Sequence, residues 1–302
     1  MKILIPNNPV SMKPKVIAIL VTYYPELDNI RQVIVNLKGQ GVQICIVDNS
    51  SVGVDFGNLG ITVFTLGENK GIAYAQNIGM KWAFEEQGAD FVLQMDQDSI
   101  PEENLVSKLF EGYNFLMSKG YKVGLIGAQD IDKDTLANSS PKIDTGNQLA
   151  EKDNLIIVNQ VLSSGSLIPK LTYEIVGGLD ERLFIDLVDF EYCWRIIGSD
   201  FIVVKNTQAV IYHKLGEGTI KIFGLLSVGL PKPFRHYYSV RNSVHLILHG
   251  NAPIYWKVSS SIKVIFKMFF YPLALPQGRE RLRFIWSGFR DGIKGRFRVI
   301  NA

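Results

Sequence analysis

The chain has 302 residues, of which 47% are hydrophobic and 20% charged, with a formal net charge of +3. This composition is ordinary for a folded globular protein and excludes a disordered chain. Two cysteines exclude a disulfide scaffold. Because Cys45 lies in an apolar run and Cys193 in a predicted helix, both are expected to be small core residues, as in a reducing cytoplasm.

The two ends of the chain differ in character. The first 14 residues contain no long apolar core and no small-residue cleavage site, so no signal peptide is predicted. No uncharged run approaches the ~20 apolar residues that a membrane-spanning helix needs. Residues 251–302 hold ten Lys or Arg and two acidic residues, a charge of +8, so the rest of the chain carries −5. A basic tail on an acidic body predicts an anionic partner, either a membrane or a nucleic acid.

Residues 16–21 form a nearly pure aliphatic run, as expected of a strand buried on both faces of a parallel sheet, and further strands are predicted over 42–47, 61–66 and 91–95. Apolar residues at helical spacing fill 27–37, and a second helix is predicted between Gly71 and about Glu86. Strands that alternate with helices in this way predict an α/β fold, with a mostly parallel central sheet flanked by helices.

Every one of these strands leads into polar residues, namely Thr22, Asp48, Asn69 and the pair Asp96 and Asp98. Solvated turns explain each of them singly. Together they predict the rim of one crevice, since open α/β sheets bind ligands at the carboxyl ends of their strands. The chain contains neither G-x-G-x-x-G in its first loop nor G-x-x-x-x-G-K-[ST] anywhere, so a nucleotide would have to be held by side chains and a metal.

The pair Asp96 and Asp98 predicts a metal site in this crevice. A hard divalent cation such as Mg²⁺ or Mn²⁺ is typically held by one or two carboxylates together with substrate phosphates. The alternative for this short motif on its own is a turn with solvated acids. Pro101 with Glu102 and Glu103 after it predicts that a helix opens directly behind the pair.

The middle of the chain continues the alternation. A helix is predicted over 105–118, strands over 123–128 and 156–162, and an irregular polar excursion over 130–154. The small residues at 163–166 would let a substrate approach the backbone. A helix that begins near Val188 would place Asp189 in its first turn, where the dipole favours negative charge; helix capping is the alternative role for such acids.

Cationic and imidazole side chains follow in the last third. Short strands at 201–204 and 209–212 lead to His213 and a glycine loop at 216–218, a place from which an imidazole can face a metal or a phosphate. Arg235 and Arg241 are suited to pair with phosphate oxygens. His245 and His249 are four residues apart without the glutamate of H-E-x-x-H, so no zinc site is predicted there.

The tail from Ile254 to Arg298 alternates apolar and basic residues, with Trp256 and Trp286 among them. This pattern predicts an amphipathic helix that lies on an anionic membrane. The alternative is a helix packed on the preceding domain. Nucleic acid is not expected as a partner, because nothing in the chain matches a recognition motif.

Taken in order, the motifs resemble glycosyltransferase family 2: Val21-Thr-Tyr-Tyr, Val47-Asp-Asn-Ser, Asn69-Lys-Gly71 with Asn77, Asp96-Gln-Asp98, Ser164-Gly-Ser166, Asp189-Phe-Glu191 with Arg195, and His213. Members of this family have the GT-A fold, a single nucleotide-sugar-binding α/β domain, and are inverting and dependent on a divalent metal. The resemblance covers about residues 14–250. Four finer features look like bacterial rhamnosyltransferases of O-antigen and capsule assembly: Asp-Gln-Asp-Ser, the segment from Phe184 to Glu191, His213-x-x-Gly216 and the string from Arg235 to Asn242.

The resemblance implies roles for individual positions. Thr22, Tyr23 and Asp48 would border the pyrimidine and ribose, and the donor-binding set as a whole would be Thr22, Tyr23, Asp48, Asn69, Gly71, Asn77, Asp96, Arg235 and Arg241. The metal, Mg²⁺ or Mn²⁺, would be held by Asp98 and Asp96, with His213 completing the metal or pyrophosphate site. Asp189 would be the general base. Glu191 is the alternative, because many members have Glu-Asp where this chain has Val188-Asp189.

The leading hypothesis is an inverting rhamnosyltransferase that moves L-rhamnose from dTDP-β-L-rhamnose to a lipid-linked oligosaccharide, in lipopolysaccharide O-antigen or other surface polysaccharide synthesis. A GT-A domain at 14–250 would be followed by a basic amphipathic tail at 251–302, and the protein would be cytoplasmic and peripheral on the inner face of the cytoplasmic membrane. One alternative keeps the fold but uses another donor such as a UDP-hexose. A second is a non-catalytic nucleotide-sugar-binding protein.

Overall fold

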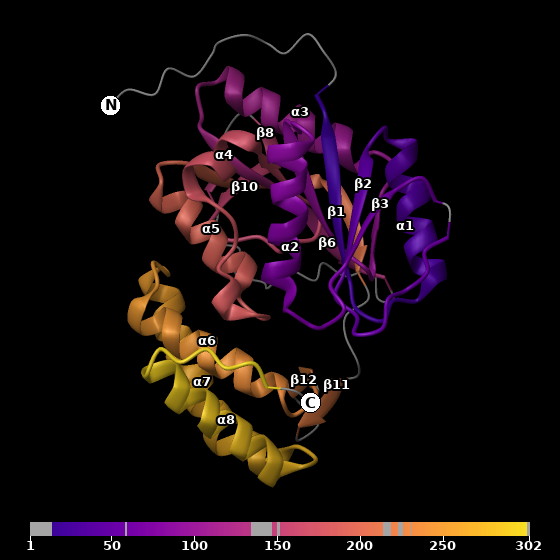
Figure 1. The fold of residues 1–302 in the computed structure, drawn as a ribbon. Coiled ribbons are helices and arrows are strands. Elements are labelled where there is room, and N and C mark those ends of the chain that lie inside the picture. The colour runs from indigo at the N-terminus through magenta and orange to yellow at the C-terminus, as the bar shows by residue number, and fades with distance from the viewer. Residues whose placement is uncertain are drawn as a thin grey trace.

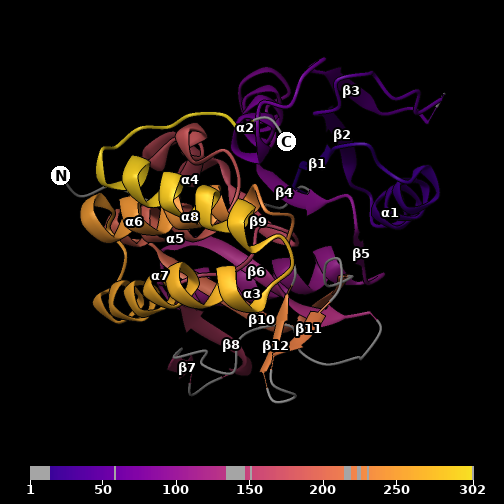
Figure 2. The ribbon, with the colours of Figure 1, turned by 90° about the horizontal axis from the view of Figure 1, so that it is seen from below.

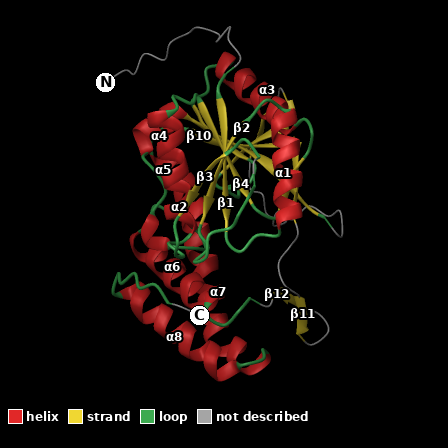
Figure 3. Ribbon diagram, turned by 45° about the vertical axis from the view of Figure 1, so that its right-hand side comes forward, coloured by secondary structure: helices red, strands yellow, loops and turns green. Residues whose placement is uncertain are grey.

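A computed structural model of the chain describes residues 14–57, 59–133, 147–149, 152–213, 219–222, 226–229 and 231–300. Helices cover both faces of a central sheet, and three C-terminal helices gather at one end of it (Figures 1 and 3). Most of the predicted polar excursion, residues 134–146, and the predicted glycine loop at 216–218 lie outside the described residues.

The N-terminal part follows the predicted alternation. Its strands are β1 (Val16–Thr22), β2 (Gln43–Asp48), β3 (Thr62–Thr65) and β4 (Phe91–Asp96). Its helices are α1 (Leu27–Gly39), α2 (Ile72–Lys81) with a π-helical turn η1 (Trp82–Glu86), and α3 (Leu105–Ser118). β1 pairs in parallel with β2 and β4, and β2 pairs in parallel with β3, so the carboxyl ends of all four strands lie at one edge.

The remaining strands make the sheet mixed. They are β5 (Ser99–Pro101), β6 (Val123–Asp132), β7 (Asn147–Leu149), β8 (Lys152–Val158), β9 (Ser166–Pro169) and β10 (Ile202–His213). Among the described residues the order is β3-β2-β1-β4-β9-β6-β10-β8-β7, with β5 paired to β10. β6 and β10 are parallel, whereas β9 runs antiparallel between β4 and β6. The predicted α/β class with a mostly parallel sheet flanked by helices is confirmed.

Several local predictions in this region were wrong. Pro101 does not open a helix: Ser99–Pro101 pairs with β10 as a short strand, and α3 begins at Leu105. The strands predicted at 201–204 and 209–212 are one strand, β10, whose register shifts between Asn206 and Val210. That irregularity interrupts the apolar pattern and makes one strand look like two.

The last elements are mostly helical. They are α4 (Lys170–Val176), a 3-10 turn η2 (Glu181–Leu183), α5 (Val188–Gly198), a hairpin of β11 (Thr219–Ile222) and β12 (Leu226–Gly229), then α6 (Arg235–His249), α7 (Ile254–Ala274) and α8 (Gly278–Ile293). Within the described part of the chain no helix is long and apolar enough to cross a membrane.

The core lies on both faces of the sheet. Alternate residues of β1 point to opposite faces, so that Ala18 and Leu20 join the cluster under α1 and α3, whereas Ile17 and Ile19 join the cluster under α2 and α5. The helical spacing predicted for α1 is confirmed, since Ile30, Val33, Ile34 and Leu37 are its buried residues. Cys45 and Cys193 are both buried, as predicted.

Helix α8 packs closely on α6 at two glycines. A Cβ atom at Gly288 would lie 2.5 Å from the carbonyl oxygen of Tyr237, and one at Gly292 would lie 2.7 Å from that of Arg241. The Tyr237 hydroxyl also donates to Asp291 at 3.0 Å. Helix α8 therefore packs on α6, as expected from the alternative prediction that the tail packs on the preceding domain. These contacts cross the domain boundary that was predicted at residue 250.

Candidate active site at the carboxyl edge of the sheet

The predicted metal-site residues come together where β4 and β10 end. The short strand β5 pairs Ser99 with His213, which brings the end of β10 beside the Asp-Gln-Asp turn. Oδ1 of Asp98 lies 3.5 Å from Nδ1 of His213, and the Ser99 hydroxyl lies 2.9 Å from the same nitrogen. Two residues that are more than a hundred positions apart thus face one another, as predicted.

Asp96 lies behind this pair in an environment that disfavours its charge. Its Oδ1 atom is buried and has no hydrogen-bond partner among the described residues. Burial, followed by the nearby charge of Asp98, raises the pKa of Asp96 to about 7; His213 lowers it, and Asp189 and Asp130 raise it further. A buried carboxylate oxygen without a protein partner, in a group of acids, is suited to a positively charged ligand.

The side chains of this group fit a divalent cation by type. No set of three or more His, Cys, Asp or Glu side chains is already arranged to enclose a metal within the described ranges. Mg²⁺ and Mn²⁺ need fewer protein ligands when a diphosphate supplies the others. The exposed Asp98, the orphaned oxygen of Asp96 and the imidazole of His213 meet that requirement in kind.

Thr22 and Asp48 lie at the ends of β1 and β2 and are fully buried. Oδ1 of Asp48 accepts from the hydroxyls of Thr22 at 2.9 Å and Ser50 at 2.7 Å, and its Oδ2 accepts from the backbone N–H of Val54 at 3.2 Å. Both carboxylate oxygens of Asp48 therefore already accept hydrogen bonds from the protein. Thr22 and Asp48 support the backbone at the rim of the predicted crevice.

Tyr23 forms the exposed part of the same rim, with 46% of its surface accessible. Its backbone N–H donates to Oε1 of Gln97 at 2.7 Å, and its carbonyl accepts from Nε2 of Gln97 at 3.3 Å. The residue between the two acids therefore fixes the Asp-Gln-Asp turn to the end of β1, a role that the sequence did not suggest.

The predicted donor loop is fixed by a pair of asparagines. Nδ2 of Asn49 donates to Oδ1 of Asn69 at 3.1 Å, and the same oxygen accepts from the backbone N–H of Gly71 at 3.0 Å. Gly71 has a φ of 87°, and a Cβ atom there would lie 2.6 Å from the carbonyl oxygen of Phe184. The loop thus meets the segment before α5 at a position where only glycine fits.

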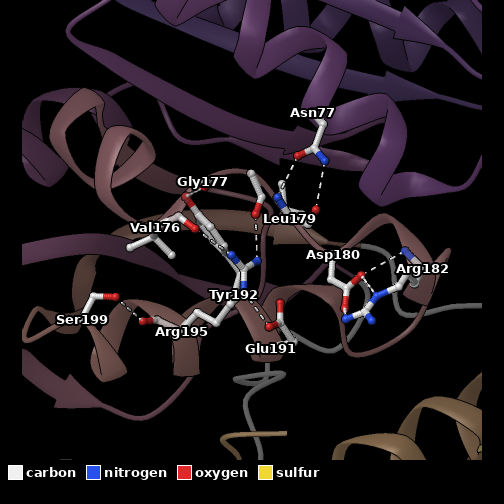
Figure 4. Close-up of polar contacts among 11 residues, drawn as sticks. Asn77, Val176, Gly177, Leu179, Asp180, Arg182, Glu191, Tyr192, Arg195 and Ser199 are labelled. Carbon is white, nitrogen blue, oxygen red and sulfur yellow. Dashed lines mark hydrogen bonds and ion pairs between the residues drawn. The ribbon is translucent and has the colours of Figure 1, made fainter. Parts of the chain in front are cut away.

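Asn77, predicted as a donor-binding residue, is occupied by the protein itself (Figure 4). Its Oδ1 accepts from the backbone N–H of Leu179 at 2.8 Å, and its Nδ2 donates to the carbonyl of Leu179 at 3.0 Å and to Glu181 at 2.8 Å. In this geometry it joins α2 to the segment between α4 and α5.

Glu191, the alternative general base, faces Arg195 on α5 (Figure 4). Nε of Arg195 donates to Oε1 of Glu191 at 2.6 Å, while the other guanidinium nitrogens donate to the carbonyls of Val176 at 3.0 Å and Gly178 at 2.8 Å. Burial raises the pKa of Glu191, and the ion pair with Arg195 lowers it. Glu191 therefore belongs to a structural ion pair.

Asp189 occupies the first turn of α5, as predicted. Its Oδ1 accepts from the backbone N–H of Phe190 at 2.9 Å. Burial raises the pKa of Asp189 to about 7, partly offset by backbone hydrogen bonds, and the charges of Asp186 and Asp130 raise it further. The charge of Asp189 also raises the pKa of Asp96, so Asp189 lies near the group at the sheet edge.

The segment before Asp189 has an unusual backbone. Phe184, Asp186 and Leu187 all have positive φ, at 65°, 67° and 65°. Non-glycine residues in this region are uncommon and persist where surrounding contacts hold them, often at functional sites. Here α6 supplies the contacts: the buried amide of Asn242 donates to the carbonyls of Leu183, Ile185 and Asp186 at 3.0, 2.8 and 2.8 Å.

The two arginines predicted to bind phosphate are placed differently. Arg241 is 1% exposed, and its guanidinium donates to the backbone carbonyls of Arg182, Leu183 and Arg298. This placement contradicts a contact with donor phosphate and assigns Arg241 to the support of residues 182–186. Arg235, at the start of α6, is partly exposed and forms an ion pair with Asp186.

Sequence reasoning missed two residues of this site, Asp130 and Asn242. Asp130 is buried near the end of β6, and its charge acts on both Asp96 and Asp189. The strand-end rule that identified Asp48 and Asp96 would have identified Asp130 as well, since it follows the apolar run at 123–128. Asn242 stood in the sequence only as the end of the string from Arg235, because the carbonyls to which its amide donates lie 56 to 59 positions earlier.

The fold and the site define the class of protein. S. aureus TarS 1–349 in complex with UDP-GlcNAc superposes with a TM-score of 0.57 at 13% identity, over 92% of this chain and 81% of that one. GalNAc-T7 with UDP, GalNAc and Mn²⁺ gives 0.58 at 11% identity, over 93% of this chain and 56% of that one. The chain spans about half (49%) of a longer TarS structure. These likenesses identify the GT-A glycosyltransferase fold.

The sequence comparisons find two matches to glycosyltransferases. Residues 18–158 match the family model of glycosyl transferase family 2. The dTDP-rhamnosyl transferase RfbF of Shigella flexneri is 29% identical over 297 residues, which cover 94% of this chain and 97% of that protein. Both matches support a glycosyltransferase of family 2, as the motifs predicted.

Proposed function

We propose that this protein transfers L-rhamnose from dTDP-β-L-rhamnose to a lipid-linked oligosaccharide, with inversion, in the synthesis of O-antigen or another surface polysaccharide. The observation that carries the proposal is that Asp98 and His213 lie 3.5 Å apart beside Asp96, whose Oδ1 atom is buried without a hydrogen-bond partner among the described residues, and near Asp189. The likeness to RfbF over almost the whole of both chains supports rhamnose as the donor sugar.

Asp98 and Asp96 would hold Mg²⁺ or Mn²⁺, with His213 beside them. When bound, the cation neutralises the diphosphate as it departs from the sugar. The Ser99 hydroxyl, 2.9 Å from Nδ1 of His213, fixes the orientation of that imidazole. Gln97 holds the turn against Tyr23, so the two carboxylates are presented from a fixed backbone.

Asp189 is the proposed general base. An acceptor hydroxyl oxygen attacks the anomeric carbon, its proton passes to the Asp189 carboxylate, and the bond between that carbon and the diphosphate oxygen breaks, releasing dTDP. A carboxyl with a pKa of about 7 is suited to this task near neutral pH. Because the displacement is single, a β-linked donor gives an α-L-rhamnoside.

The nucleotide would lie along the ends of β1 and β2. Tyr23 offers an exposed ring at this rim, while the buried Thr22 and Asp48 hold the backbone behind it. The loop fixed by Asn69 and ending at Gly71 would border the donor from the other side. In this arrangement the partly buried Asn77 and the buried Arg241 support the donor site from behind and do not contact the ligand.

Membrane association is proposed for the face that α7 leaves exposed. Its exposed apolar residues recur every three or four positions and so form one stripe: Ile254, Val258, Ile262, Ile265, Phe269 and Leu273. α8 lies beside α7 (Figure 2) and adds the exposed Trp286 and Leu282. A long apolar stripe on a segment with charge +8 is suited to the surface of an anionic bilayer, which would place the protein on the inner face of the cytoplasmic membrane.

The proposed domain division is a GT-A domain at 14–250 and a basic tail at 251–302, with the tail packed on α6.

A turnover assay with purified protein tests the donor. Release of dTDP from dTDP-rhamnose in the presence of Mg²⁺ and an extracted lipid-linked acceptor is expected, with no release of UDP from UDP-hexoses. Turnover of a UDP-hexose alone would refute the rhamnose donor and leave the fold assignment untouched.

A further inference from the structure

A pocket of about 260 Å³ lies where α5, α6 and α7 meet. Asp186 from the segment before α5, Ser239 and Ser243 from α6, and Lys263 and Lys267 from α7 contribute to its walls. None of these side chains belongs to the proposed donor site. The volume lies just under the range of ~300–1,000 Å³ that is usual for pockets of drug-sized ligands, so the pocket suits a small group.

Lys267 gives the pocket its chemical character. Its ammonium nitrogen donates to the Ser239 hydroxyl at 3.0 Å, and within the described part of the chain it forms no ion pair. Burial lowers the pKa of Lys267, the charge of Lys263 lowers it further, and Asp186 raises it. A cation that is withdrawn from water and hydrogen-bonded to a neutral hydroxyl lacks the direct ion pair that buried charges usually have.

The other polar groups of the pocket are compatible with an anion. Ser239, Ser243 and Ser260 bring hydroxyls that can donate hydrogen bonds to oxyanions. The carboxylate of Asp186 also faces the pocket, but it is already in an ion pair with Arg235. The two lysines therefore leave the pocket with an excess of positive charge.

The position of the pocket links it to the acceptor. Asp186, Leu187 and Phe190 belong both to its wall and to the segment that carries Asp189. On the other side, Lys263 and Lys267 stand on the helix whose exposed residues Ile262 and Phe269 form part of the apolar stripe. An amphiphile whose chain lies along that stripe would place a charged head group in this pocket.

We infer that the pocket between α5, α6 and α7 binds the phosphate or diphosphate group that joins the lipid to the glycan of the acceptor. This inference rests on the proposed function, because it assigns a site to the acceptor of that reaction. It also separates two duties of the basic tail: the apolar stripe contacts the bilayer, and Lys263 and Lys267 select the phosphate-bearing substrate.

Calorimetric titration of geranyl diphosphate into the full chain tests this site. Saturating dTDP and Mg²⁺ keep the donor site filled, so that the probe cannot bind there. Lys263→Ala and Lys267→Ala are each expected to weaken binding by about tenfold or more, because a charge-assisted contact is lost. Lys257→Ala removes the same charge from α7 outside the pocket and is expected to change the affinity by less than about twofold.

Lys263 is exposed, so its substitution leaves the fold intact and the test remains informative even when Lys267→Ala unfolds the chain. Equal affinities for wild type, Lys263→Ala and Lys267→Ala would overturn the inference, as would an equal loss in Lys257→Ala. The titration involves no turnover. A wild type that binds the probe but does not consume dTDP-rhamnose would therefore refute the proposed function without refuting the site.

A second arm separates acceptor phosphate from a membrane phospholipid. Vesicles of phosphatidylcholine with and without phosphatidylglycerol are sedimented with wild type, Lys263→Ala and Lys257→Ala. Equal, small losses in the two variants support an acceptor site. A loss confined to Lys263→Ala, together with release of geranyl diphosphate by phosphatidylglycerol vesicles, would overturn it in favour of a phospholipid site.

Discussion

The side-chain amide of Asn242 donates a hydrogen bond of 2.8 Å to the backbone carbonyl of Asp186, a residue whose φ is 67°. Asn242 is fully buried on α6, whereas Asp186 lies three residues before the proposed base, Asp189. Left-handed conformations at non-glycine residues cost about 1–3 kcal/mol each. The contact therefore shows which element keeps the segment before α5 in its strained form.

Asn242→Ala should destabilise the chain and lower its activity. The carbonyls of Ile185 and Asp186 lose their amide donor, whereas that of Leu183 still accepts from Arg241. Each unsatisfied group costs about 1–3 kcal/mol, so a loss of about 2 kcal/mol in the free energy of unfolding is expected. Urea unfolding measures it. As the control, Asn29→Ala removes a surface contact with Glu26 and should change stability by less than about 0.5 kcal/mol. Equal stabilities of the two variants would contradict the supporting role.

Gly71→Ala should raise the KM for the donor and lower stability. Its φ is 87°, and the added Cβ would lie 2.6 Å from the carbonyl oxygen of Phe184. Gly67→Ala is a matched control, since its φ is 71° and nothing lies within 4 Å of the new atom. The difference between the two variants isolates the clash, expected at about 1–3 kcal/mol. If both variants show the same donor kinetics and thermal unfolding, the contact between Gly71 and Phe184 does not affect donor binding.

Asp189→Asn should lower kcat by about 10²–10⁴-fold, with the donor KM little changed, because it removes the proton acceptor and keeps the shape. Glu191→Gln should keep most of the activity, since the amide oxygen still accepts from Nε of Arg195. Steady-state kinetics on both variants decide between the two acids. A larger loss in Glu191→Gln than in Asp189→Asn would reverse the assignment.

Activity should rise with pH through about 7, because Asp189 must lose its proton before it can act as a base. Stability of the metal-free protein should change in the opposite direction. Asp96 and Asp189 have folded-state pKa values of about 7, above the ordinary 3.8, so they bind protons more tightly when folded. Their contribution is complete below about pH 4 and is lost as the pH rises through 7.

Asp96→Asn should remove part of that pH dependence. Urea unfolding at pH 5 and pH 8, with and without Mg²⁺, provides the measurement. Added Mg²⁺ is expected to restore stability to the wild type at pH 8, since it binds the charged carboxylates of the folded state. A wild type that is more stable at pH 8 than at pH 5 without metal would contradict the burial of these groups.

Phe269→Glu should reduce binding to vesicles that contain phosphatidylglycerol, while the free energy of unfolding stays nearly constant. Phe269 is 69% exposed in the middle of the α7 stripe. Val35 on α1 has the same exposure of 69%, so Val35→Glu makes a comparable change away from the tail. Sedimentation with vesicles compares them. Undiminished binding of Phe269→Glu would exclude the stripe as the membrane contact.

Local sequence pattern was sufficient for the first four strands, which are short apolar runs, and for α1 and α3, whose buried residues recur at helical spacing. It failed for β5 and β9, which have three and four residues. These short strands exist because neighbouring strands offer hydrogen bonds to them: β5 pairs with β10, and β9 pairs with β4 and β6. No periodicity can develop in so few residues.

The approach of Asp98 to His213 was predictable, because strand ends in a parallel sheet converge. Arg241 was not predictable in the same way. Its residue type suits phosphate and backbone carbonyls equally, and the choice depends on Leu183, 58 positions earlier. Asn77 gives the same lesson, since its partner Leu179 is 102 positions later. Polar residues that close long-range contacts look like ligand-binding residues until the fold is known.

The packing of α8 on α6 limits how this chain can be recombined with its relatives. Gly288 fits against Tyr237 on one side of α6, and Asn242 of the same helix holds the segment at 183–186. A hybrid whose crossover lies at residue 250 would join α6 from one parent to α8 from another and would disturb both contacts. A crossover before residue 181 would keep the base, its supporting helix and the pocket lysines as one inherited unit, so acceptor preference should transfer with that whole block.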